Sequence, residues 1–280
     1  MDQRLVPPVT YQGGKGRLAA AIARLIPVPD GATFCDLCCG SGAVSLAMLE
    51  AGLPPDRLAM VDIGPWGAFW AAIGDGTFDC GRLEEAVARL PEDPAGIKTA
   101  LEELALGPAD GDGSVYAFLL LQAGSFGGKA VGRRGGRWVT HGFRPLWTPK
   151  PGCSRKSPVN PMMPMPGTLL ARARELARRC AGLSGAEADA VGFRPPLWAV
   201  AYIDPPYGGT TRYAGAAGLD AVAVARGLGC PCYVSEARPF GGCSLLLSRG
   251  RAKGGISGGR GRANEEWLSA FNAPPLRLET

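Results

Sequence analysis

Three stretches of the sequence predict an α/β fold built on a parallel sheet. Residues 32–52 pass from an apolar, strand-like segment through a glycine turn into an apolar, helix-like segment. A second apolar segment, residues 58–61, follows, and a third, residues 197–203, appears after a long intervening region. Strands that alternate with helices are typical of a Rossmann-like sheet, which carries functional groups at the carboxyl ends of its strands. The sequence therefore predicts a Rossmann-like α/β sheet with an inserted smaller region.

The composition predicts a soluble intracellular protein. The chain has 280 residues, 46% of them hydrophobic, and a net charge of +5. Its first residues lack the charged-then-apolar pattern of a secretory signal, and it has no window of about 18 uninterrupted apolar residues. We therefore expect a cytoplasmic protein that does not use a membrane.

The nine cysteines are expected to be reduced thiols. Cys35, Cys38 and Cys39 lie in one apolar run, and Cys230 and Cys232 lie in another, where alternate side chains of a strand point to opposite faces. The chain has one histidine and no second Cys-x-x-Cys motif at a suitable distance. We favour packing over a zinc site and expect no metal.

Residues 9–26 run from a glycine turn into a helix that Pro27 ends. The turn places Lys15 near the start of this helix. Lys15 is either an exposed residue before an amphipathic helix or a cation that neutralises an anionic group. The second interpretation uses Gly13 and Gly14, which let the backbone approach such a group closely.

The glycine turn after the first strand is of the kind that holds a nucleoside. Gly40, Ser41 and Gly42 form the turn, but Ser45 stands where a dinucleotide-binding motif has its third glycine, which favours a cofactor without a pyrophosphate. Asp62 ends the second strand 22 positions after Gly40, where an acid usually holds ribose hydroxyls. The alternative is an ordinary βαβ unit in which Asp62 caps the next helix.

Charge is segregated along the middle of the chain. Residues 82–106 form an acidic segment with a helical pattern, and an apolar helix or strand follows at residues 115–122. Residues 124–180 carry twelve lysines and arginines against one acid, and residues 249–262 carry five bases and no acid. The aromatic residues interleaved with the first basic segment are Trp138, Phe143 and Trp147.

This basic segment is either a polyanion-binding surface that also stacks on bases or a solvated loop with structural tryptophans. Residues 145–166 contain seven prolines, and we expect them to form an ordered, packed loop before a basic helix at residues 168–180. The residues expected to contact nucleic acid are Lys129, Arg133, Arg134, Arg137, Arg155 and Lys156.

The third apolar segment ends in D-P-P-Y, a group suited to a flat, amino-bearing ring. Pro205 and Pro206 cannot continue a sheet ladder, so the strand over residues 197–203 should stop at Asp204. That leaves an acceptor carboxylate, prolyl carbonyls and the ring of Tyr207 at one rim, as a nucleobase requires.

The α/β pattern then resumes to residue 271. The elements expected there are a helix over residues 219–228, strands over 230–235 and 245–248, and a last segment over 266–271. We therefore expect one discontinuous sheet domain made of residues 1–74 and 190–280, with residues 75–189 inserted between its halves.

Three motifs in this order resemble the DNA adenine-N6 methyltransferases of the class that includes the GATC-methylating enzymes. They are Y-Q-G-G-K near the amino terminus, D-L-C-C-G-S-G-A-V in the glycine turn, and D-P-P-Y after the long basic segment. F-G-G-K, S-P-V-N-P-M-M-P-M-P and Y-V-S-E resemble a phage-type branch of that family. The resemblance covers both halves of the sheet and parts of the insert. It implies that residues 1–74 and 190–280 form the catalytic domain and that residues 75–189 form the target-recognition and DNA-binding region. It implies an S-adenosylmethionine-dependent methyltransferase sheet, with S-adenosyl-L-methionine as the cofactor.

The resemblance also implies roles for matching positions. Asp204 would sit between the methyl donor and the target amine, and Tyr207 would stack on the target base. The catalytic motif is Asp204, Pro205, Pro206 and Tyr207. The cofactor-binding residues are Tyr11, Gly14 and Lys15 at its methionine part, Asp36, Gly40, Ser41 and Gly42 in the loop beneath it, Asp62 at its ribose, and Asp204.

Two positions depart from the family pattern or are left open by it. Cys38 replaces the aromatic residue that usually precedes the first motif glycine by two positions, which removes packing but no polar contact. The acid that holds the cofactor adenine is Glu187 or Asp189.

The expected reaction is methyl transfer to the N6 amine of an adenine flipped out of double-stranded DNA. The alternatives are the same chemistry on RNA or on another amine-bearing base, and a relative that binds nucleic acid without catalysis. A nicotinamide oxidoreductase is disfavoured by the missing third glycine. No obligatory protein partner is evident in the sequence.

Overall fold

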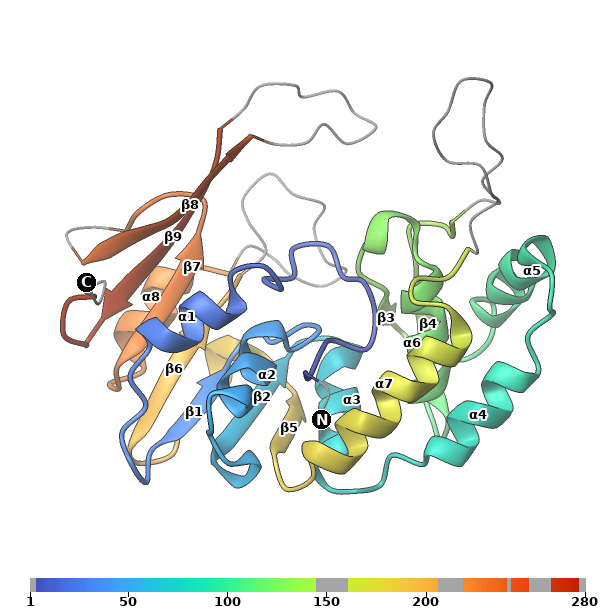
Figure 1. Ribbon diagram of the computed structural model, residues 1–280, viewed down its shortest axis with the longest axis horizontal. Helices are drawn as coiled ribbons and strands as arrows, with labels where there is room; N and C mark the ends of the chain where they lie inside the picture. The colour runs from blue at the N-terminus through green and yellow to red at the C-terminus, as the bar shows by residue number, and fades with distance from the viewer. Residues whose placement is uncertain (1–3, 145–160, 206–218, 241–242, 252–262, 277–280) are drawn as a thin grey trace.

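A seven-stranded sheet forms the centre of the computed structural model, which describes residues 4–144, 161–205, 219–240, 243–251 and 263–276. The strand order is β5-β2-β1-β6-β7-β9-β8. The first five strands in this order are parallel, and β9 and β8 are each antiparallel to their neighbour (Figure 1). The strands are β1 (Thr33–Asp36), β2 (Leu58–Asp62), β5 (Ser184–Glu187), β6 (Ala199–Ile203), β7 (Cys232–Glu236), β8 (Ser244–Arg251) and β9 (Ala263–Phe271). This mixed sheet confirms the predicted Rossmann-like α/β class.

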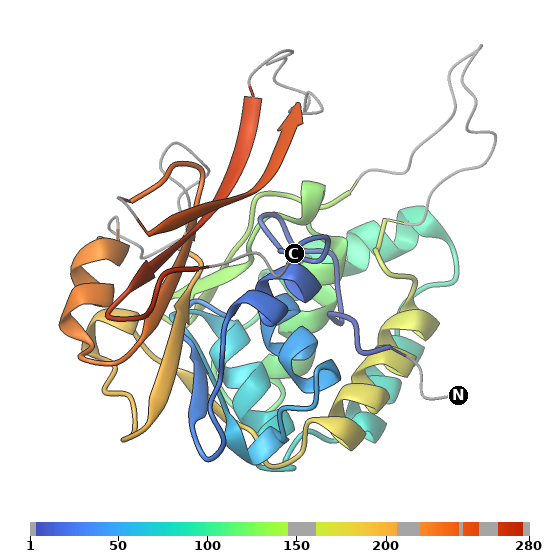
Figure 2. The same ribbon diagram turned by 60° about the vertical axis from the view of Figure 1, so that its left-hand side comes forward.

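Helices cover the sheet and extend beyond its β5 edge. Figure 1 shows α4 to α7 gathered beyond that edge, and Figure 2 shows the β8–β9 hairpin rising from the opposite end. The helices are α1 (Ala19–Leu25), α2 (Ala43–Glu50), α3 (Pro65–Gly74), α4 (Cys80–Ala88), α5 (Pro94–Leu104), α6 (Ser114–Gly124), α7 (Pro166–Arg179) and α8 (Ala221–Gly227). Short 3₁₀ turns are η1 (Pro55–Arg57), η2 (Phe126–Gly128) and η3 (Ala190–Gly192), and a separate hairpin joins β3 (Gly132–Arg134) to β4 (Arg137–Val139).

The strand order reverses between β1 and β6, which sit side by side in the middle of the sheet. From β1 the chain moves outward to β2 and β5, and from β6 it moves the other way to β7. Open α/β sheets bind ligands at the carboxyl ends of the two strands that flank such a reversal. Here those ends carry Asp36 and Asp204, so the topology alone marks this edge as the place to look for a site.

The central strands are apolar throughout because both of their faces are covered. On β6, Val200 and Tyr202 face the larger core beneath α1, α2 and α3. Ala199, Ala201 and Ile203 face a smaller cluster on the side of α8. Side chains alternate between faces with a period of two, so one unbroken apolar run supplies both cores.

The expected inserted region shares its core with the sheet. Trp66 of α3 packs edge-to-face against Phe118 of α6, with ring centroids 5.0 Å apart. The apolar segment at residues 115–122, expected to be either a helix or a strand, is part of helix α6. Strand β5 lies within the main sheet beside β2, although we expected the insert to extend to residue 189. We therefore place the end of the inserted region before β5.

Two expectations about strands need correction. The strand expected over residues 197–203 begins only at Ala199, because Trp198 adopts a left-handed backbone (φ 63°) that interrupts an extended chain. Leu197 and Trp198 are 90% and 84% exposed, so their apolar character did not indicate burial. The strand expected over residues 245–248 is also longer, and runs from Ser244 to Arg251.

The expected helices agree more closely with the structure. The acidic segment at residues 82–106 forms α4 and α5, with Pro94 in the first turn of α5. The basic helix expected at residues 168–180 is α7, which begins at Pro166. Most of the proline-rich loop expected at residues 145–166 lies outside the described residues.

Glycines allow α3 to lie directly on β5. A Cβ atom on Gly185 would lie 2.1 Å from the Ala71 backbone nitrogen, and one on Gly67 would lie 2.2 Å from the Ala186 carbonyl oxygen. Both clashes are with backbone, which cannot rotate away. The helix–strand distance therefore depends on the missing side chains.

Gly185→Ala should lower the free energy of unfolding by about 1–3 kcal/mol, because the methyl group must push α3 away from the sheet. Gly167→Ala is the control, since a Cβ there meets nothing within 4 Å. Urea denaturation of both variants checks this. Equal stability of the two variants would contradict the tight contact.

Candidate active site

The centre of the candidate site is a lysine held between two carboxylates. Lys15 Nζ lies 2.6 Å from Asp204 Oδ1 and 3.5 Å from Glu266 Oε1. Asp204 follows β6, and it meets Lys15 although the two residues are 189 positions apart in the sequence. Glu266 lies on β9, the last described strand. The fold thus joins the amino-terminal glycine turn to the D-P-P motif.

Burial and neighbouring charges shift the pKa values of Lys15 and Asp204 in opposite directions. Burial by itself lowers the pKa of Lys15, but the carboxylates of Asp204 and Glu266 outweigh it and the pKa is raised. Burial raises the pKa of Asp204, and the charge of Lys15 opposes this rise. Lys15 is therefore a protonated, 8% exposed cation that holds the Asp204 carboxylate at the end of β6.

The glycine loop is fixed between Asp62 and α3. The backbone N–H groups of Gly40 and Gly64 donate to the two oxygens of Asp62, at 3.0 and 2.8 Å. Trp70 Nε1 donates to the Gly40 carbonyl at 2.9 Å. Gly42 has φ 79°, and a Cβ there would lie 2.5 Å from the Trp70 ring, so only glycine fits.

Asp62 holds the loop and still has acceptor capacity, since each carboxylate oxygen accepts more than one hydrogen bond. Burial raises its pKa, while the two backbone N–H groups lower it. The alternative in which Asp62 only caps the next helix is too narrow, because the same carboxylate bonds Gly40 as well as Gly64.

The amino-terminal turn packs directly on the glycine loop. A Cβ on Gly40 would lie 2.8 Å from the Tyr11 ring, and one on Gly14 would lie 3.6 Å from Ser41 Oγ. Tyr11 also packs edge-to-face against Trp66, with centroids 5.6 Å apart. The two motifs expected to bind one cofactor are therefore neighbours in space.

Asp36 is a buried carboxylate with one oxygen unused. Ser45 Oγ donates to Asp36 Oδ2 at 2.7 Å, whereas Oδ1 has no hydrogen-bond partner within the described part of the chain. Burial raises the pKa of Asp36 to about 7, against the Ser45 hydrogen bond and with a contribution from the charges of Asp204 and Asp62. Such an orphaned acceptor fits a ligand that brings a donor or a positive charge.

The structure describes half of the D-P-P-Y motif. Asp204 is partly buried, and Pro205 is buried directly after it. Pro206 and Tyr207 lie outside the described residues. Their roles remain predictions, as does the stacking expected of Tyr207.

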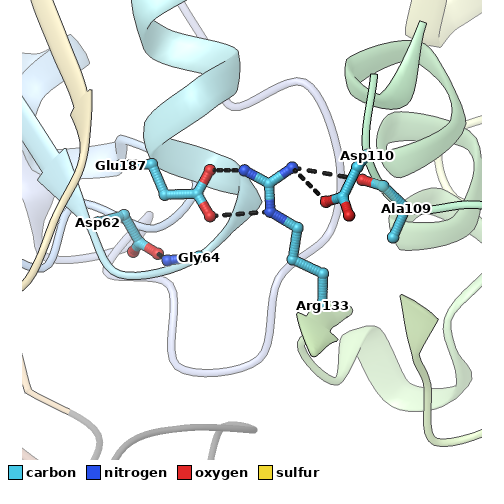
Figure 3. Close-up of polar contacts among 6 residues, drawn as sticks. All are labelled: Asp62, Gly64, Ala109, Asp110, Arg133 and Glu187. Carbon is cyan, nitrogen blue, oxygen red and sulfur yellow. Dashed lines mark hydrogen bonds and ion pairs between the residues drawn. The ribbon is translucent and has the colours of Figure 1, made fainter. Parts of the chain in front are cut away.

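Among the described residues, the basic side chains expected to bind nucleic acid have different surroundings. Arg134 and Arg137 are exposed and face each other across the β3–β4 hairpin. Arg133 instead forms ion pairs with Glu187 and Asp110 (Figure 3).

Lys129 lies before the hairpin in the chain. Lys129 is half-buried in the loop that follows η2. In that loop the carbonyl of Gly128 accepts a hydrogen bond from the Gln12 N–H at 2.7 Å, next to the amino-terminal turn. Arg155 and Lys156 lie outside the described residues.

The two acids considered for the cofactor adenine have different surroundings. Glu187 is occupied by Arg133. Asp189 accepts a hydrogen bond from the Val191 N–H at 2.9 Å, and its charge raises the pKa of Cys38 beside the glycine loop. The surroundings therefore favour Asp189 over Glu187.

Glu266 is the site residue that sequence reasoning missed. The sequence places Glu265, Glu266 and Trp267 in succession, and alternation along a strand sends neighbouring acids to opposite faces. Glu265 pairs with Arg249 at 3.1 Å, and Glu266 turns to Lys15. Alternation could have separated the two acids, but only the sheet order brings β9 close to Lys15.

The described cysteines are free thiols, and burial raises the pKa of Cys35 to about 12, so it stays protonated. Among the described residues, no group of three His, Cys, Asp or Glu side chains is placed to hold a metal ion. No helix in the described ranges is both long enough and apolar enough to cross a membrane.

Asp36→Asn should change how stability depends on pH. Because the folded pKa of Asp36, about 7, exceeds the value of about 3.9 in an unfolded chain, the folded state retains a proton that the unfolded state releases between these values. This group therefore costs stability as pH rises from about 4 to 7. In urea denaturation without ligand, the free energy of unfolding of Asp36→Asn should therefore increase relative to that of the wild type as the pH is raised from 5 to 8.

Ser45→Ala tests the same account in the other direction. It removes the hydrogen bond that favours the charged form of Asp36, so the loss of stability with rising pH should extend to a higher pH. A difference between Asp36→Asn and wild type that is the same at pH 5 and pH 8 would refute the buried titration.

Comparison with known proteins agrees with this geometry. Residues 11–64 match the model of the D12 class N6 adenine-specific DNA methyltransferase family. The matched segment includes Lys15, the glycine loop and Asp62, and ends before Asp204. No curated protein matches the chain. The match does not distinguish the phage-type branch, which remains a prediction. With its α/β sheet and its converging motifs, the chain is similar to the D12 class N6 adenine-specific DNA methyltransferase family over residues 11–64.

Proposed function

We propose that this DNA adenine methyltransferase transfers a methyl group from S-adenosyl-L-methionine to N6 of an adenine flipped out of double-stranded DNA. The observation that carries this proposal is the Lys15–Asp204 pair, which joins the amino-terminal motif to the D-P-P motif at the reversal point of the sheet. The family match supports DNA adenine methylation in general.

The residues at this edge fit the cofactor. The orphaned Oδ1 of Asp36 suits its ammonium group, and Asp62 suits its ribose hydroxyls. Asp189 is the acid best placed for its adenine. The cofactor, when bound, supplies an activated methyl group on a positively charged sulfur.

The net charge of the central group also fits a cationic donor. Lys15, Asp204 and Glu266 are one cation and two acids. Asp36 and Asp62 lie close enough to interact with Asp204 or with each other, so Glu266 is one of several acids at this edge that would attract a sulfonium.

Asp204 and Pro205 would activate the target amine. The exocyclic nitrogen of adenine is a poor nucleophile because its lone pair is conjugated with the ring. Accepting its hydrogens at the Asp204 carboxylate and the Pro205 carbonyl draws the lone pair out of conjugation. Asp204 would accept the proton that the nitrogen loses as it gains the methyl group. Lys15 keeps the carboxylate in this orientation.

The target base must leave the duplex, because the Asp204 carboxylate is recessed at the end of β6. Tyr207 would replace the lost stacking. Methylation assays on DNA and RNA oligomers, with the modified base identified by mass spectrometry, test the substrate. A product on RNA alone, or none on adenine, would overturn the proposal.

Asp204→Ala should lower methyl transfer by at least about a hundredfold, since it removes the preorganised acceptor. DNA binding, measured by fluorescence anisotropy, should change little because the exposed arginines expected to contact DNA, Arg134 and Arg137, lie on the β3–β4 hairpin and not beside Asp204. A variant with wild-type turnover would refute the role given to Asp204.

Glu266→Gln should weaken binding of S-adenosylmethionine roughly three- to tenfold, because the site loses a negative charge near the sulfonium. Binding of S-adenosylhomocysteine, which carries no charge on sulfur, should change less. Calorimetric titration of both ligands measures this difference.

Glu265→Gln is the matched control for this charge. It removes an acid from the next position of the same strand, where the side chain pairs with Arg249 and points away from Lys15. Equal weakening of both ligands by Glu266→Gln would show that the residue acts on packing and not on charge.

A further inference from the structure

Arg133 is bound on two sides by acceptors. Its Nε donates to Glu187 Oε1 at 3.0 Å, and its Nη2 forms an ion pair with Glu187 Oε2. On the other side Nη1 donates to the Ala109 carbonyl at 3.3 Å and lies 3.7 Å from Asp110 Oδ1. Figure 3 shows the guanidinium between Glu187 and the loop that carries Ala109 and Asp110. A two-point pair of this kind fixes orientation as well as distance.

The β3–β4 hairpin has two different faces. Arg133 stands opposite Trp138, which is buried, so this pair faces the protein. Arg134 stands opposite Arg137, and both are exposed on the other face. Arg133 therefore points toward the protein, whereas its neighbour Arg134 points toward solvent together with Arg137.

Glu187, the acid that Arg133 binds, lies next to Asp62, which holds the glycine loop. Glu187 ends β5 in register with Asp62 at the end of β2. The charge of Glu187 raises the pKa of Asp62, so the two acids interact electrostatically. Figure 3 shows Asp62, with its bond to Gly64, beside Glu187. Arg133 compensates the Glu187 charge at this point.

We propose that Arg133 is a positioning residue that connects the β3–β4 hairpin to the cofactor edge of the sheet through Glu187, and is not a phosphate contact. This inference rests on the proposed cofactor role of Asp62. The Arg133 side chain holds the hairpin against the protein, and the same side chain neutralises Glu187 next to Asp62. The outward arginines of the hairpin face solvent. Loss of Arg133 leaves the Glu187 carboxylate partly buried and unpaired beside Asp62. Its negative charge then favours the protonated form of Asp62, and a protonated carboxyl has less acceptor capacity for ribose hydroxyls.

Cofactor affinity and the salt dependence of DNA binding separate the two roles. Arg133→Met should weaken S-adenosylmethionine binding without DNA by about two- to thirtyfold, the range for residues that act through a neighbour. The logarithmic salt slope of DNA binding should stay at the wild-type value. Arg134→Met, the matched control, should leave cofactor affinity unchanged and reduce the slope by about 1 if that arginine contacts a phosphate.

Removing the charge that Arg133 compensates should restore the site. Adding Glu187→Gln to Arg133→Met should recover most of the lost cofactor affinity, since no unpaired acid then lies beside Asp62. Cofactor affinity equal to wild type in Arg133→Met, or a salt slope lowered by about 1 in that variant, would overturn the inference.

A separate measurement distinguishes this inference from the proposed function. If the wild-type protein does not bind S-adenosylmethionine, the proposed function fails, and the connection is then tested by urea denaturation of the two single variants and the double variant. A double variant no less stable than Arg133→Met supports the connection through Glu187. Additive losses would show that Arg133 and Glu187 stabilise the protein independently.

Discussion

The buried pair of Lys15 and Asp204 is the interaction on which the site depends. Burying either charge without the other would be costly in free energy. The position of the amino-terminal turn and that of Asp204 at the end of β6 therefore depend on each other. Because Asp204 follows the strand next to β1, the pair also fixes the turn over the switch point of the sheet. Glu266 then stabilises the positive charge of Lys15 from β9, which brings the antiparallel end of the sheet into contact with the candidate site.

The glycine loop shows how far the support of the site extends. Asp62 holds it from one side and Trp70 from the other, and Trp70 belongs to α3. The position of α3 is set by its close contact with β5. Loop, helix and edge strand thus form one packed unit, in which a shift at the sheet edge is transmitted to the backbone expected beneath the cofactor.

Local patterns were enough to predict the fold class and the helices, because the apolar runs and the turn glycines act over short distances. The D-P-P motif and the glycine turn gave candidate residues, and their meeting with Lys15 follows from strand order. One error had a physical cause: Trp198 is apolar yet exposed. The basic sequence around Arg133 gave no sign of the ion pair that this residue forms with Glu187. Glu266 was missed because its partner is distant in sequence, and no local pattern encodes an ion pair across a sheet.

The separation of Lys15 from its partners affects the order in which the chain can be completed during synthesis. The lysine precedes Asp204 by 189 positions, which a ribosome adding roughly 5–20 residues per second covers in about 10–40 s. Until then the Lys15 ammonium lacks the Asp204 carboxylate as its partner. The pair at the switch point therefore cannot form before β6 is made, and Lys15 gains the Glu266 carboxylate only when β9 is complete.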